Sequence, residues 1–150
     1  MEPETKYCQA ILQAWYPGQS GGKAAAEVLF GDYNPAGRLP VTFYRNTAQL
    51  PDFEDYNMTG RTYRYFKGDP LFPFGYGLSY TTFNYGNIKL EQTIKVGETA
   101  KIIVPVTNTG NRDGEEVVQV YLKKQEDAEG PVKTLRAFKR VQILQEKQSM

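Results

Sequence analysis

Three carboxylates lie close together in the segment Pro51–Met58, whose sequence is PDFEDYNM. They belong to Asp52, Glu54 and Asp55. Two positioned carboxylates can act as an acid–base or nucleophilic pair in the hydrolysis of a glycosidic bond. However, acid-rich surface loops are common, and their carboxylates are more often solvated or paired with nearby arginines. The sequence leaves both interpretations open and favours the solvated loop.

Arginine and tyrosine alternate shortly after this loop, in RTYRYF (residues 61–66). If the segment is extended, Arg61, Tyr63 and Tyr65 share one face. Tyrosine rings stack on sugars and arginine donates hydrogen bonds, so these three residues are the candidate substrate-binding residues. The alternative is a segment whose rings are buried against a neighbouring domain. The segment has no core of its own, which favours this alternative.

Two absences narrow the possible chemistry. The sequence contains no histidine, which excludes Ser–His and Cys–His nucleophile pairs and histidine metal sites. Its single cysteine, Cys8, excludes an internal disulfide and a thiolate metal cluster, and is most simply a small buried residue. We therefore expect no metal ion and no cofactor. Any catalysis would depend on carboxylates, tyrosine, lysine or arginine.

The composition is that of a folded protein with no bias toward a charged partner. The 150 residues are 40% hydrophobic, and 18 basic against 17 acidic residues give a net charge of +1. Because no basic stripe is present, we expect no nucleic-acid partner. The apolar runs are far shorter than the roughly 20 residues that cross a bilayer, so we expect no membrane partner. The first residues, MEPETKYCQ, lack the features of a secretory signal.

The N-terminal segment predicts one strand–helix unit. The residues Gln9–Gly18 (QAILQAWYPG) predict a short buried strand closed by a Pro-Gly turn. A helix follows, with Ser20 as its cap and Gly31 as its end. The turn between them lacks the spacing of a phosphate-binding loop. Strand and helix in this order are typical of an α/β layer, but one unit cannot form a sheet, so we expect further strands upstream.

The middle of the chain, from Arg45 to Tyr85, shows no helical period. Prolines and glycines interrupt it, and most of the tyrosines and phenylalanines of the sequence lie in it. A loop of this length in a compact domain is usually functional or wraps a surface. We interpret it mainly as a linker whose rings bind two domains together.

The C-terminal part predicts antiparallel strands with alternating apolar residues. The four segments are NIKLEQ (87–92), TAKIIVPVTNTG (99–110), EEVVQVYLKK (115–124) and TLRAFKRVQIL (134–144). Turn-separated strands of this kind indicate a β-sandwich, but a complete one needs about seven strands. The predicted fold class is therefore an α+β fragment. It consists of an α/β remnant (1–45), an aromatic linker (46–84) and a partial antiparallel β-sandwich (85–150).

Three motifs, in the right order, resemble glycoside hydrolase family 3. Residues 11–43 are similar to the end of that family's α/β sandwich domain, with its PG turn, its GG-x-A-x-A helix and its G-D-x-N-P-x-G-R-L-P-x-T exit. Residues 61–83 resemble the linker of its β-glucosidase and β-xylosidase branches. Residues 104–124 and 131–144 resemble its fibronectin type III-like domain, which has an immunoglobulin-like sandwich.

The resemblance implies an exo-acting, retaining β-glycosidase that acts on a β-linked oligosaccharide or glycoside. It also implies that the catalytic aspartate and glutamate lie in upstream domains, so no catalytic residue is assigned here. The fragment alone is expected to be inactive and to have the upstream catalytic domains as partners. Family members are often periplasmic or extracellular. The alternative function is a non-catalytic module that binds carbohydrate or protein, and a weaker alternative is pairing with a second copy.

Overall fold

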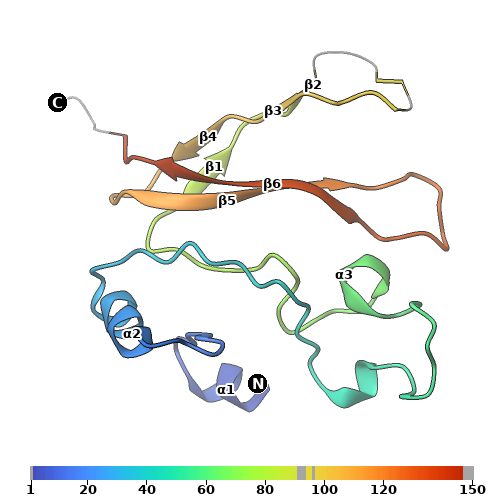
Figure 1. Ribbon diagram of the computed structural model, residues 1–150, viewed down its shortest axis with the longest axis horizontal. Coiled ribbons are helices and arrows are strands. Elements are labelled where there is room, and N and C mark those ends of the chain that lie inside the picture. Colours follow the sequence, from blue (N-terminus) through green and yellow to red (C-terminus); the bar gives the residue numbers. More distant parts are fainter. Residues whose placement is uncertain (1, 91–93, 96, 147–150) are drawn as a thin grey trace.

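The structure is a computed structural model that describes residues 2–90, 94–95 and 97–146 (Figure 1). The long β5–β6 hairpin lies between the short strand pairs on one side and the linker and helices on the other. The helices are α1 (Glu2–Tyr7), α2 (Gly21–Phe30) and α3 (Thr62–Tyr65), with a 3₁₀ turn at Thr47–Gln49. The strands are β1 (Phe83–Tyr85), β2 (Lys89–Leu90), β3 (Ile102–Ile103), β4 (Val106–Asn108), β5 (Gly114–Leu122) and β6 (Thr134–Ile143).

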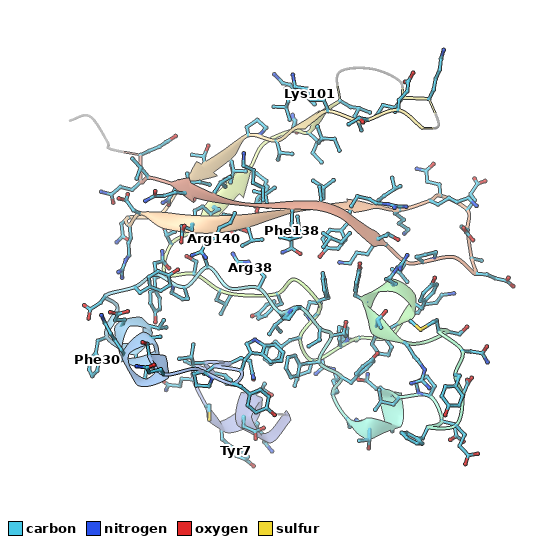
Figure 2. All side chains as sticks on the ribbon, viewed as in Figure 1. Tyr7, Phe30, Arg38, Lys101, Phe138 and Arg140 are labelled. Carbon is cyan, nitrogen blue, oxygen red and sulfur yellow. The ribbon has the colours of Figure 1, made fainter. Side chains whose placement is uncertain are left out.

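Helix α2 begins and ends where the sequence predicts. Ser20 is its N-cap residue, although its side chain makes no capping hydrogen bond. Gly31 ends the helix with a φ of 83°, and its N–H donates to the carbonyl of Val28. This left-handed conformation favours glycine because a Cβ would crowd the backbone. No residue of α2 is buried, and Phe30 points outward with 83% of its surface exposed (Figure 2).

The strand predicted at Gln9–Gly18 is wrong. The residues between α1 and α2 form no strand, and nearly all of them are exposed. A strand requires a neighbour that satisfies its N–H and C=O groups, and no described segment pairs with these residues. The prediction that Cys8 is buried is also wrong, because Cys8 is exposed.

The predicted antiparallel strands are confirmed, as three two-stranded sheets. They pair β1 with β4, β2 with β3, and β5 with β6. In the hairpin Glu116 lies opposite Val141, and the register shifts between Val120 and Tyr121. The segment 99–110 forms two strands. Strand β3 ends before Val104 and Pro105, and β4 begins after them. Proline lacks the N–H that a ladder needs. Strand β2 covers part of the predicted segment 87–92, and residues 91 and 92 lie outside the described residues.

A buried amide at the end of β4 connects several segments. Asn108 is 1% exposed, and its Oδ1 accepts hydrogen bonds from the Thr81 hydroxyl (2.7 Å) and the Gly110 N–H (3.1 Å). Its Nδ2 donates to the carbonyls of Arg112 (2.7 Å) and Ile143 (3.1 Å). The amide thus uses both of its donor hydrogens and both acceptor positions. One side chain thereby fixes the β4–β5 turn against the end of β6.

Apolar burial contributes little within the described residues. Ala36, at 2% exposure, is the one hydrophobic residue among them that is buried. Many large apolar side chains are exposed, including Trp15 at 48%, Leu29 at 69% and Phe138 at 70%. Extended exposed apolar surface marks interaction sites or a tendency to associate. No helix of the described residues is long and apolar enough to span a bilayer.

Candidate functional site

The linker folds back on the segment that leaves α2. Leu39 donates its N–H to the carbonyl of Tyr76 (2.8 Å), and Gly75 donates to the carbonyl of Leu39 (2.7 Å). Phe43 and Phe72 form an isolated antiparallel bridge, with a 2.9 Å hydrogen bond. Residues 39–43 and 71–76 therefore form a paired ribbon, and this ribbon lies beneath the β5–β6 hairpin (Figure 1).

Polar side chains of β5 hold this ribbon against the sheet. Gln119 donates from Nε2 to the carbonyl of Gly75 (3.1 Å). The Tyr121 hydroxyl donates to Oε1 of the same glutamine, so both ends of the amide are bonded. At an earlier point of the linker, the carbonyl of Arg64 accepts a hydrogen bond from the N–H of Val132 (2.6 Å), in the loop between β5 and β6. The linker is thus connected through hydrogen bonds to β5 and to the loop that precedes β6.

Gly75 lies where the linker and the sheet approach each other closely. Its φ is +81°, and an added Cβ would lie 2.2 Å from Oε1 of Gln119. We expect Gly75→Ala to lower the free energy of unfolding by about 2 to 3 kcal/mol, from backbone strain together with the displaced glutamine. Urea unfolding followed by circular dichroism measures this. The matched control is Gly37→Ala, whose Cβ meets nothing within 4 Å. If both variants lose the same stability, the close approach is not the cause.

An ion pair lies beside this contact. Arg38 and Glu116 are bonded through Nη2 and Oε2, and their side chains are only 10% and 9% exposed. The Tyr85 hydroxyl donates to the other oxygen of Glu116 (2.8 Å). Burial raises the pKa of Tyr85, and its hydrogen bond to the carboxylate raises it further. Figure 2 shows Arg38 between the linker and the hairpin, so this cluster joins the exit of α2 to the strands.

A cavity of about 280 Å³, largely open to solvent, lies next to the ion pair. Its walls come from the segment after α2, the linker, β1, β5 and the residues just before β6. They include Arg38, Phe74, Tyr76, Tyr85, Gln119 and Lys133. Aromatic rings, an amide and two cations around one hollow can bind a small polar molecule through stacking and hydrogen bonds.

The three predicted substrate-binding residues do not share a face, because residues 62–65 form the helical turn α3 and are not extended. Arg61 donates from Nε to the carbonyl of Asn57 (3.0 Å), and from Nη2 to the carbonyls of Asp52 (3.0 Å) and Asp55. These bonds close the acidic loop. The guanidinium therefore has a role inside the chain.

Tyr63 is also occupied by contacts within the chain. Its ring stacks on Phe74 at 4.2 Å and meets the edge of Tyr121 at 6.1 Å. Its hydroxyl accepts a hydrogen bond from the N–H of Leu135 (3.2 Å). Tyr65 is half-buried and lies 5.9 Å from the guanidinium of Arg64. Of the three residues, Tyr65 keeps the most freedom to contact another molecule.

The acidic loop binds its own backbone. Asp55 Oδ1 accepts from the N–H (2.9 Å) and the side-chain amide (2.7 Å) of Asn57, and Asp52 Oδ1 accepts from the N–H of Glu54 (3.3 Å). The hydrogen bonds from Asn57 lower the pKa of Asp55. Among the described residues no group of three acidic or sulfur ligands could hold a metal ion. The geometry is that of a solvated loop.

The sequence interpretation overlooked the residues of the ion pair. Arg38 and Glu116 are 78 positions apart, and nothing in the local pattern links them. One signal was present: Glu116 occupies the same strand face as Val118 and Val120, where a charge is unusual. Gln119 and Lys133 carry no comparable signal.

Two models of known domain families match this chain. The model of the fibronectin type III-like domain matches residues 116–150, in agreement with the β5–β6 hairpin. The model of the glycosyl hydrolase family 3 C-terminal domain matches residues 1–80, which is more than half of the chain. The chain therefore belongs to glycosyl hydrolase family 3.

Its relatives are glycosidases of much greater length. A xylan 1,4-beta-xylosidase of Xylanibacter ruminicola is 59% identical over 95% of this chain, which covers 16% of that protein. A periplasmic beta-glucosidase of Salmonella typhimurium is 42% identical over 93% of the chain, covering 20% of that protein. A solved β-glucosidase structure from Erythrobacter marinus superposes with a TM-score of 0.79 at 44% identity, over 95% of this chain and 19% of that one. The chain thus spans a fifth or less of these relatives.

Proposed function

We propose that the chain is the C-terminal structural part of an exo-acting β-glycosidase that hydrolyses β-linked glycosides with retention of configuration. The observation that carries the proposal is the 59% identity, over 95% of the chain, to a protein named as a xylan 1,4-beta-xylosidase. We further propose the division into an α/β portion (1–45), a linker (46–84) and a fibronectin type III-like unit (85–150).

In this proposal the chain helps to position the catalytic domains and contributes no catalytic residue. Retaining hydrolysis needs two carboxylates about 5 Å apart across the sugar. The carboxylates of Asp52 and Asp55 instead accept hydrogen bonds from their own loop, and Glu116 is bonded to Arg38 and Tyr85. The nucleophile and the acid–base residue would come from upstream domains, held in place through the linker.

A second candidate function is a non-catalytic carbohydrate-binding module. It is favoured by Phe53 and Tyr56, which are 93% and 92% exposed on the loop that Arg61 closes. Exposed rings on a closed loop suit stacking on a sugar chain. In this version Tyr65 is the best placed of the three residues Arg61, Tyr63 and Tyr65 to contact the carbohydrate, because the other two side chains are bonded within the chain.

One experiment with two readouts separates the candidates. The purified chain is assayed with aryl β-xylosides and β-glucosides, and its retention on insoluble cellulose, which carries no acidic sugar, is measured alongside. The structural proposal predicts neither turnover nor retention. Turnover that disappears on Asp52→Asn, Glu54→Gln or Asp55→Asn would contradict it by placing catalysis in this chain. Retention that Tyr56→Ala or Tyr65→Ala abolishes would favour the binding module instead.

A further inference from the structure

The cavity beside the ion pair has the size and position of a small-molecule site. Its volume of about 280 Å³ is slightly below the range for pockets that hold drug-sized ligands, about 300–1,000 Å³, which suits a single small ring. Its lining comes from the linker segment 73–76 and from β5, together with Arg38, Tyr85 and Lys133. A ligand there would contact two parts of the chain at once.

Most polar groups in the cavity already have partners. Glu116 is bonded to Arg38 and Tyr85, and Gln119 is bonded at both ends, to Gly75 and Tyr121. A ligand could bond only to the lone pairs and hydrogens that this network leaves unused. They fix the shape of the cavity and carry no uncompensated charge.

Lys133 differs from these groups. Its side chain lies over the ring of Tyr121, with Nζ 4.4 Å from the ring centre. No carboxylate of the described residues forms an ion pair with it, and the residue is half-buried. A ring face attracts the cation but accepts none of its three hydrogen bonds in the way a carboxylate does. The cavity therefore has one positively charged end that an anion would complete.

Two of the tyrosines that line the cavity are partly exposed. Tyr76 and Tyr85 are 38% and 46% exposed while they line it. Such rings stack on the apolar faces of a pyranose, and their surroundings offer hydrogen bonds to its hydroxyls. A plain anion would use only the lysine, whereas a sugar with a carboxylate would use the whole lining.

We propose that this cavity binds a hexuronic acid residue, with its carboxylate on Lys133 and its ring against Tyr76 and Tyr85. The site does not depend on catalysis by this chain. It would allow the chain to hold acidic sugars at the place where the linker meets the sheet.

The test is calorimetric titration of the full chain with methyl β-D-glucuronide, methyl β-D-glucoside and methyl β-D-xyloside. We expect the glucuronide to bind at least about tenfold more tightly than either neutral sugar at low salt, since a single charge-assisted contact is worth about that factor. High salt should reduce the difference, because an accessible ion pair is screened. The absence of glucuronide binding, or equal binding of all three sugars, would overturn the proposal.

Variants assign the site within the chain. Lys133→Met keeps the aliphatic stem on Tyr121 and removes the charge, so the preference for the glucuronide should disappear, whereas Lys133→Arg should keep it. Lys139→Met makes the same charge change at an exposed position of β6 outside the cavity and should bind as the unaltered chain does. Circular dichroism verifies that each variant is folded. If Lys133→Met does not fold, Lys133→Gln takes its place. A preference that survives loss of the Lys133 charge would overturn the assignment.

Discussion

Replacing Asn108 by aspartate is expected to lower the free energy of unfolding by about 3 to 5 kcal/mol. The substitution preserves shape but removes the two N–H donors that bond to the carbonyls of Arg112 and Ile143. Each carbonyl would then face an oxygen without a hydrogen bond, at a position only 1% exposed. Leaving a buried polar group unsatisfied costs about 1 to 3 kcal/mol, and burying a charge adds to this.

The measurement is urea unfolding of the variant beside Asn111→Asp. Asn111 lies in the same turn and is exposed, so its substitution should change stability by no more than about 0.5 kcal/mol. If Asn108→Asp is already unfolded without urea, that result also agrees with the predicted loss of stability. Equal stabilities of the two variants would show that the amide network does not hold the turn.

Removing either partner of the Arg38–Glu116 ion pair is expected to lower the free energy of unfolding nearly as much as Asn108→Asp does. We expect Arg38→Met and Glu116→Gln each to cost about 3 kcal/mol, because either change leaves one buried charge without its partner. The side chains are 10% and 9% exposed, so water cannot compensate. The double variant contains neither charge. Its loss should be smaller than the sum of the single losses by about 2 kcal/mol.

The same cycle on Arg45 and Asp69 is the control. This pair has a similar contact distance of 2.6 Å, but its side chains are 40% and 80% exposed. Exposed pairs contribute between about 0 and 1 kcal/mol, so little coupling is expected there. If the two cycles give the same coupling energy, burial does not distinguish the Arg38–Glu116 pair.

The elements that the sequence predicts correctly depend on local signals. Helix α2 has Ser20 before it and a glycine after it that tolerates positive φ. Strands β5 and β6 contain alternating apolar residues and are separated by a turn, and these two features predict both their existence and their antiparallel pairing. Each of these signals lies within a few residues of the element that it specifies.

The elements that it misses depend on distant partners. An apolar segment such as Gln9–Gly18 has the composition of a strand, yet it becomes one only beside another strand. The alternation in residues 61–66 would place Arg61, Tyr63 and Tyr65 on one face if the segment were extended, but residues 62–65 form the helical turn α3. There Tyr63 packs on Phe74, and its hydroxyl accepts from Leu135. The candidate site could not be predicted for the same reason, because its cavity forms only where the linker contacts β5.

The hydrogen bonds between the segment after α2 and the β5–β6 hairpin join residues that are far apart in the sequence, and this separation matters during biosynthesis. Arg38 and Glu116 are 78 residues apart, and Tyr33 accepts a hydrogen bond from Arg140, 107 residues later. Closing contacts across such separations is slow, and a ribosome adds only about 5 to 20 residues per second. For several seconds the α2 segment and the linker would therefore emerge without the hairpin that holds them. During this interval the exposed apolar surface of the nascent chain is available to chaperones.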